Sequence, residues 1–238
     1  MNVITYGKFK DECTSAFINS DSYKEERNDV KTLVDVAFND FIYKIKKLSY
    51  NKTIDVQIGR YLIAGDHYGA ITVNFKPTHG WRDWLINALC FGIKWHHGYI
   101  SEIRKYSVDL INEILDVFND DDKEIILAGR SKGAAEALML SKSILDIVRR
   151  KGVQHMLVGA FAPPKSVSKR LGEKIAESVG IANIYTFIHR SDIVPKIFFW
   201  FGIVPSYGIV FGKNGQNPFK THHIVTTDRS VYDNLGIY

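Results

Sequence analysis

A serine between two glycines is the residue whose type and spacing point most directly to chemistry. Ser131 lies in Gly129-Arg130-Ser131-Lys132-Gly133, after the apolar run 125–128 and before a stretch rich in alanine and leucine. This pattern predicts a buried strand that turns sharply into a helix, with the serine at the tip of the turn. The two glycines omit side chains that would collide in a strained turn. A serine held in this way can act as a nucleophile, whereas in an ordinary strand–turn–helix connection it is merely solvated.

A nucleophilic serine needs a base to take its proton and a carboxylate to orient that base. The predicted acid is Asp192, which follows the apolar segment 183–188 and begins the sequence Asp-Ile-Val-Pro. The predicted base is His222, with His223 as the second choice, in a His-His-Ile pattern that can open a last strand or helix. On a strand, only one of two adjacent side chains can face the serine. Together these residues predict a Ser-His-Asp triad that cleaves carboxylic esters through an acyl-enzyme.

Alternating strands and helices indicate the fold that would position these groups. Strands are expected at 54–58, 61–64, 70–75, 125–128, 156–160 and 183–188, and helices at 81–89, 100–118, from the turn to about 150, and 166–179. The runs 54–58 and 61–64 are expected to pair as a hairpin across Gly59-Arg60. The pattern predicts an α/β fold with a mostly parallel central sheet and helices on both faces. Catalytic groups then lie at the carboxyl ends of the strands.

The N-terminal part of the chain shows a helical period instead. Apolar residues recur at helical spacing from Val30 to Ile45, and lysines follow at 44, 46 and 47. Acidic residues are interspersed, so we expect this helix to pack on the sheet rather than lie on a membrane. The expected organisation is an N-terminal helical segment, 1–50, packed on a core domain, 51–238.

Composition narrows the class of protein. The chain has 238 residues and a net charge of +5, from 31 basic and 26 acidic residues. This mild excess favours anionic surfaces such as lipid headgroups, and no motif for nucleic acid accompanies it. The two cysteines have no metal-ligand spacing, and we expect neither metal nor cofactor. The absence of a signal-like or membrane-spanning apolar run predicts a cytoplasmic protein with at most transient membrane contact. The oligomeric state stays open.

Four segments in order resemble the class 3 lipases, the fungal-lipase-like branch of the α/β-hydrolases. They are Phe75-Lys76-Pro77-Thr78 with Asp83-Trp84-Leu85-Ile86-Asn87-Ala88-Leu89, then Trp95-His96-His97-Gly98-Tyr99, then the Ser131 turn, then Asp192-Ile193-Val194-Pro195. They are similar to the family's F-R-G-T and D-W-L-x-N-L, V-H-x-G-F, G-H-S-L-G and D-x-V-P. The resemblance covers roughly residue 54 to the C-terminus and implies an α/β-hydrolase fold.

The resemblance also implies an oxyanion hole made by the backbone N–H groups of Thr78 and Lys132. Two basic residues depart from the family at the turn, because Arg130 stands for its histidine and Lys132 for its leucine. Two added charges beside the serine favour an anionic or phospholipid-like ester over a neutral one. The apolar stretch 197–204 follows the predicted acid, and Phe199 and Trp200 within it are expected to bind the acyl chain of a lipid or small ester.

The sequence is also compatible with two other functions. One is a non-catalytic protein of the hydrolase fold that binds a ligand, a membrane or a partner, as the unusual residues around Ser131 would allow. The other is an acyltransferase or thioesterase, which keeps the serine but changes the acyl acceptor. Fold alone does not decide between these functions, because different chemistries share one fold.

Overall fold

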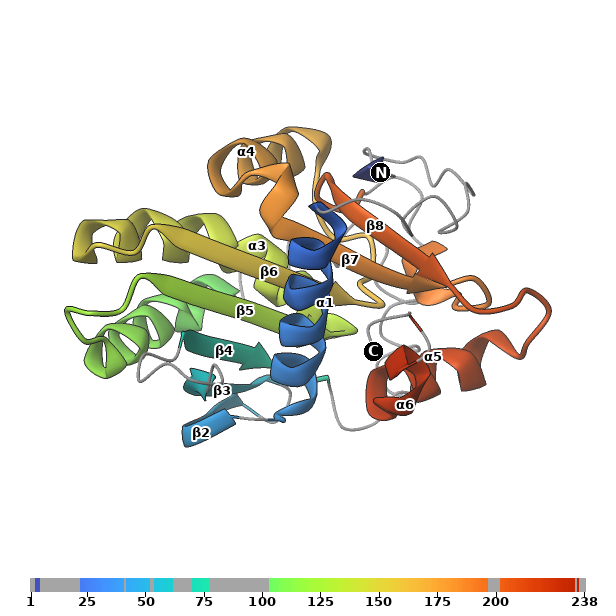
Figure 1. The fold of residues 1–238 in the computed structure, drawn as a ribbon, viewed down its shortest axis with the longest axis horizontal. Coiled ribbons are helices and arrows are strands. Elements are labelled where there is room, and N and C mark those ends of the chain that lie inside the picture. The colour runs from blue at the N-terminus through green and yellow to red at the C-terminus, as the bar shows by residue number, and fades with distance from the viewer. Residues whose placement is uncertain are drawn as a thin grey trace.

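The structure is a computed structural model that describes residues 3–4, 22–40, 42–51, 54–61, 70–77, 103–196, 202–233 and 235. One eight-stranded sheet runs through it in the order β1-β8-β7-β6-β5-β4-β3-β2 (Figure 1). Strands β4 to β8 are parallel, and β1, β2 and β3 pair antiparallel at the two edges. The predicted α/β fold with a mostly parallel central sheet is confirmed.

The elements follow the chain in a simple order. The strands are β1 (Val3–Ile4), β2 (Ile42–Asn51), β3 (Ile54–Tyr61), β4 (Ile71–Phe75), β5 (Glu124–Arg130), β6 (His155–Phe161), β7 (Ile184–His189) and β8 (Ser206–Phe211). The helices are α1 (Ser22–Phe38), a helix over 103–117, α3 (Lys132–Val148), α4 (Lys169–Val179), α5 (Pro218–Thr227) and α6 (Ser230–Asp233), with short 3-10 turns at 149–151, 181–183 and 194–196.

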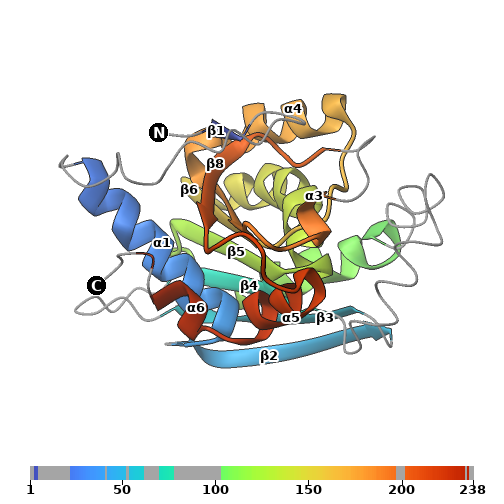
Figure 2. The same ribbon diagram turned by 90° about the vertical axis from the view of Figure 1, so that its right-hand side faces the viewer.

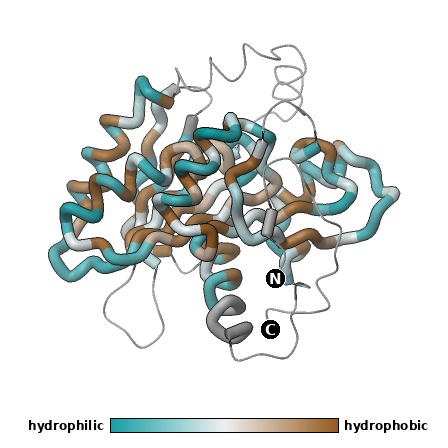
Figure 3. The backbone as a smooth tube through the Cα atoms, turned by 90° about the horizontal axis from the view of Figure 1, so that it is seen from above, coloured by the Kyte–Doolittle hydropathy of each residue, from teal (hydrophilic) through white to brown (hydrophobic). Residues whose placement is uncertain are grey.

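Helices cover both faces of the sheet because the central strands are apolar on both sides. In β5, Ile125 and Leu127 pack with α3 and the helix over 103–117, while Ile126 and Ala128 pack with α1 on the other face. Figures 1 and 2 show α1 crossing one face of the sheet, with α3 and α4 on the other. Along the helices, hydrophobic and hydrophilic residues alternate as expected for elements buried on one side (Figure 3).

Helix α1 ends earlier than its period suggested. Asn39 has a φ of 64°, and the N–H of Asp40 donates to the Asp35 carbonyl at 2.8 Å, which closes the helix in a left-handed cap. The side-chain amide of Asn74 on β4 donates to the carbonyls of Val36 and Ala37, each at 3.0 Å. The last carbonyls of α1 are therefore satisfied by the sheet that the helix covers.

The predicted helix was wrong beyond Phe38, because the next residues form strand β2. Ile42 and Ile45 also fit a helical spacing, but this segment pairs with β3, and Leu48 and Tyr50 pack against the core. The predicted hairpin across Gly59-Arg60 was also wrong, because these two residues lie within a single strand. β3 runs unbroken from Ile54 to Tyr61, and its hairpin partner is β2, which crosses the expected boundary at residue 50.

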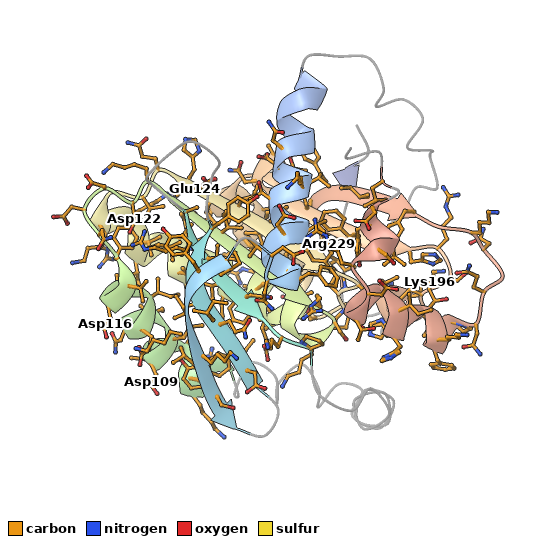
Figure 4. All side chains as sticks on the ribbon, turned by 60° about the horizontal axis from the view of Figure 1, so that its bottom comes forward. Asp109, Asp116, Asp122, Glu124, Lys196 and Arg229 are labelled. Atoms are coloured by element: carbon orange, nitrogen blue, oxygen red, sulfur yellow. The ribbon has the colours of Figure 1, made fainter. Side chains whose placement is uncertain are left out.

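A buried acidic group joins α1 to the C-terminal helices. Asp35 is fully buried and accepts from Lys31 at 2.7 Å, from the Tyr61 hydroxyl at 2.9 Å and from Arg229 at 2.6 Å. Arg229 also pairs with Asp40, and Figure 4 shows it between α1 and the C-terminal helices. Burial and the bond to Asp35 raise the pKa of Tyr61 to about 12, so Tyr61 remains a donor at neutral pH.

Replacing Asp35 by alanine should destabilise the protein strongly, because Arg229 and Tyr61 lose the carboxylate that they surround. Breaking a buried ion pair costs about 3 kcal/mol or more of unfolding free energy. The matched control is Asp146→Ala, which removes the exposed pair with Lys142 and should cost at most about 0.5 kcal/mol. Urea unfolding of both variants measures the difference, and equal losses would contradict this account.

Candidate active site

The turn after β5 places Ser131 in a backbone conformation that side-chain-bearing residues rarely adopt. Ser131 has φ 54° and ψ −120°, between the last residue of β5 and the first residue of α3. Its N–H donates to the Phe161 carbonyl at the end of β6 at 2.8 Å, so the turn remains tied to the sheet. Strain of this kind costs about 1–3 kcal/mol and persists only where the surrounding structure fixes it.

The two flanking glycines make this turn possible by leaving out specific atoms. A Cβ on Gly129 would lie 2.2 Å from the Gly133 carbonyl oxygen, and a Cβ on Gly133 would lie 2.2 Å from the Phe75 carbonyl oxygen. Both distances lie far inside van der Waals contact, and both clashing atoms are backbone. The start of α3 therefore lies directly against the end of β4, which no larger residue would allow.

Three predicted side chains meet at this edge of the sheet. The Ser131 hydroxyl lies 2.9 Å from Nε2 of His222, and Nδ1 of His222 lies 3.0 and 2.9 Å from the two carboxylate oxygens of Asp192. The exposed fractions are 7% for Ser131, 5% for His222 and 0% for Asp192. A serine, an imidazole and a carboxylate in this order, shielded from water, fit a Ser-His-Asp triad.

Separate elements hold the other two members of the triad. Asp192 follows β7, and its side chain also accepts the N–H of Val194 at 2.9 Å, which fixes the carboxylate. His222 lies on α5, so the helical alternative is the one that forms, and Figure 2 shows α5 across the carboxyl ends of β4 and β5. Asn217 caps α5 by accepting two N–H groups at 3.1 Å. His223 is exposed, because consecutive helix residues point about 100° apart.

The two basic residues beside Ser131 point into the protein. Arg130 donates to the Thr226 carbonyl at 2.8 Å, and its guanidinium lies 4.7 Å from the centre of the Phe38 ring. The Arg130 side chain turns toward α1 and α5, so its charge lies against these two helices. The Lys132 side chain is 6% exposed, and its ammonium lies 3.5 Å from the Glu136 carboxylate.

Three other predicted residues, Thr78, Phe199 and Trp200, lie outside the described residues. The described chain reaches Pro77 after β4, and the Phe75 carbonyl lies against the start of α3, as the Gly133 distance shows. Lys132 is the first residue of α3, where backbone N–H groups lack intrahelical acceptors.

Among the described residues, no group of three or more histidine, cysteine or acidic side chains gathers as a metal site. Within the same residues, no helix has the length and apolarity to cross a membrane.

A second histidine lies buried behind the acid. His189 is 7% exposed, its Nδ1 accepts the N–H of Ser191 at 3.1 Å, and its carbonyl accepts the N–H of Asp192 at 2.9 Å. Burial lowers its pKa, and Lys196 lowers it further against the opposing effect of Asp192. Its neutral ring supports the loop that carries the acid.

The sequence pattern of the family described as Lipase (class 3) matches residues 68–202, more than half of the chain. This chain belongs to the class 3 lipase family. The matched segment includes Ser131 and Asp192 but ends before His222. The contact of His222 with Ser131 is therefore known from the structure and not from the family match. The predicted resemblance is confirmed, and with it the function: the protein is a carboxylic ester hydrolase.

Solved lipases share this fold at low sequence identity. A triacylglycerol lipase, described as having a serine protease triad as its catalytic centre, has a TM-score of 0.62 at 15% identity, over 82% of this chain and 83% of that one. Lipase II from Rhizopus niveus has a TM-score of 0.60 at 17% identity, over 84% of both chains. The lipase from Rhizopus microsporus var. chinensis has a TM-score of 0.57 at 17% identity, over 84% and 78%. No curated protein sequence matches this chain.

His189 should make the protein less stable in mild acid. Its pKa in the folded state lies below the ordinary value of 6.5, so the unfolded chain binds the proton more readily. Its contribution to stability is present above pH 6.5 and is lost as the pH falls through the lowered pKa. In His189→Asn the amide oxygen can still accept from Ser191, but the variant does not titrate, so its unfolding free energy should fall less between pH 7 and 5.

The matched control for this titration is His155→Asn, because His155 is exposed on β6. Denaturant unfolding of the three proteins at pH 7, 6 and 5 measures the difference. The control should follow the native protein, and a native-like pH slope in His189→Asn would contradict the role given to the buried ring.

Proposed function

We propose that Ser131 is the nucleophile, His222 the general base and Asp192 the orienting acid of a hydrolase that cleaves lipid esters. The observation that carries the proposal is the hydrogen-bonded series from the Ser131 hydroxyl through His222 to Asp192, at 2.9 Å for each nearest pair. A binding protein without catalysis has no need for this buried alignment at a strained turn. Membership of the class 3 lipases supports a lipid or related ester as the substrate.

The reaction would proceed in two steps. The Ser131 oxygen attacks the ester carbonyl carbon as its proton passes to Nε2 of His222, which gives a tetrahedral oxyanion. His222 then gives this proton to the leaving alcohol oxygen as the carbon–oxygen bond breaks, and the acyl group remains on Ser131. A water molecule repeats the attack, releases the acid and restores the serine. Asp192 accepts from Nδ1 throughout and stabilises the imidazolium.

We propose that the oxyanion is held by the backbone N–H groups of Lys132 and Thr78. The position of Lys132 at the start of α3 supports its part, since the N–H groups of the first helical turn point along the helix dipole and favour negative charge. The family resemblance and the closeness of the β4 end to α3 support the part of Thr78. Loss of one such donor costs about 3–4 kcal/mol of transition-state stabilisation.

The nucleophile can be tested with a fluorophosphonate probe, which reacts only with an activated serine. We expect labelling of the native protein on the peptide that contains Ser131, as read by mass spectrometry, and none in Ser131→Ala. Ser141→Ala is the matched control, because Ser141 is a buried serine on α3 that donates to the Leu138 carbonyl. Folded native protein that stays unlabelled, or labelled Ser131→Ala, would refute the assignment.

We also propose that Phe199 and Trp200 bind the acyl chain and that the enzyme contacts lipid surfaces transiently. Their apolar stretch follows the acid in the sequence, and the net charge of +5 favours anionic headgroups. Burying a methylene group is worth about 0.8 kcal/mol, so long acyl chains gain most from an apolar wall.

The double variant Phe199→Ser with Trp200→Ser tests the acyl-chain proposal. Hydrolysis of a decanoyl ester should fall at least about tenfold more than hydrolysis of the acetyl ester with the same alcohol. The control is Val108→Ser, which replaces an exposed apolar residue on the helix over 103–117. Initial rates on both esters give the comparison, and an equal loss on both would count against the acyl-chain role.

A further inference from the structure

The residue before the nucleophile reaches the helix that carries the base. Arg130 ends β5, and its guanidinium donates to the Thr226 carbonyl, 96 positions along the chain, at 2.8 Å. Thr226 lies in the last turn of α5, where carbonyls have no intrahelical donor. A cation at this end of a helix also interacts favourably with the helix dipole. Arg130 therefore satisfies a group that α5 leaves unpaired.

The contact extends back to the base through α5 itself. The Thr226 hydroxyl donates to the carbonyls of His222 at 2.8 Å and His223 at 3.0 Å, so Thr226 and His222 are joined within one helical turn. The neighbouring carbonyl, that of Val225, accepts the Tyr232 hydroxyl at 2.7 Å. Two donors from outside the helix thus hold the end of α5 one turn beyond the catalytic imidazole.

The surroundings of Arg130 fix its orientation. The guanidinium lies over the Phe38 ring of α1 at 4.7 Å, and that ring packs against Tyr232 with centroids 5.5 Å apart. Burial lowers the pKa of Arg130 to about 10, with Tyr232 opposing the change, so the side chain is a cation at neutral pH. A planar guanidinium can stack on a ring and donate in its own plane at once, which an ammonium cannot do.

We propose that Arg130 is a positioning residue that holds α5, and with it His222, at hydrogen-bonding distance from Ser131. The inference rests on the proposed function of the triad and explains why a partly buried arginine stands directly beside the nucleophile. One end of the link is covalently joined to Ser131, and the other is hydrogen-bonded within one turn of His222. The type of side chain matters, because the link needs a long side chain with a hydrogen-bond donor and a planar group that stacks on the Phe38 ring.

The size of the effect follows from the distance that the link controls. The Ser131 oxygen and Nε2 of His222 are 2.9 Å apart, and misplacement of a catalytic group by about 1 Å costs about 100-fold in rate. Loosening α5 reduces proton transfer and leaves the binding of a small ester unchanged. A positioning role therefore predicts a loss in kcat with KM retained.

The experiment compares Arg130→Met, Arg130→Lys and the native protein on 4-nitrophenyl butyrate. Rates are normalised to folded protein by circular dichroism. Arg130→Met should lower kcat by about 10- to 100-fold and change KM by less than about twofold. Arg130→Lys keeps a cationic donor and should recover part of kcat. The matched control is Arg149→Met, since Arg149 also donates to a carbonyl at a helix end, that of Ser178 at 3.3 Å, away from the triad, and should keep native kcat.

Other outcomes overturn the inference. Native kcat in folded Arg130→Met, with or without a lower melting temperature, makes Arg130 merely structural. A raised KM with unchanged kcat, above all on an anionic ester, makes it a substrate-binding residue. If Arg130→Met does not fold, Phe38→Leu replaces it: this variant removes the stacking ring and should lower kcat by several-fold at native KM, and native kcat there overturns the inference.

Fluorophosphonate labelling separates this inference from the proposed function. If the native protein is labelled at Ser131 and Arg130→Met is labelled at the same rate, the triad stands and the positioning role fails. If the native protein is not labelled, the triad itself fails. Slower labelling of Arg130→Met, with the native rate in Arg149→Met, is the result that we expect.

Discussion

The close approach of two backbones decides the geometry of the whole site. The Phe75 carbonyl at the end of β4 lies where a side chain on Gly133 would begin, and the Gly133 carbonyl lies where a side chain on Gly129 would begin. This contact forces the chain to reverse within the few residues around Ser131, whose φ of 54° is the strained result. The parallel strands on both sides hold the strain, because the Ser131 N–H is bonded to the end of β6.

The other members of the triad depend on polar contacts rather than on backbone sterics. Asp192 is fully buried, with its carboxylate bonded to His222 and to the N–H of Val194. His222 is carried by a ten-residue helix at the edge of the fold, which is anchored by its cap and by donors at its last turn. The two parts of the site therefore differ physically: the serine is held by the sheet, and the base is held by a short helix that a few hydrogen bonds and the buried Val225 fix in place.

The parallel sheet and the turn at Ser131 could be predicted from sequence because their signals are local. Apolar runs mark the strands, and the spacing of Gly129 and Gly133 marks the turn. Strand β2 could not be predicted, because Ile42 and Ile45 also fit a helical period and only pairing with β3 decides the outcome. The direction of the Arg130 side chain was equally out of reach, since its acceptor lies 96 residues further along the chain. Local pattern predicts elements, whereas contacts between distant residues decide where side chains point.

The link between Asp35 and Arg229 joins residues 194 positions apart, on opposite sides of the segment that the family pattern matches. During synthesis, Asp35 and Ser131 leave the ribosome well before Arg229 and His222 do. Until this later segment has emerged, the Asp35 carboxylate lacks its contact with Arg229, and Ser131 lacks its contact with His222. Both contacts are supplied by one short stretch, from His222 to Arg229. Folding of this segment therefore couples the buried ion pair of Asp35 to the proposed triad.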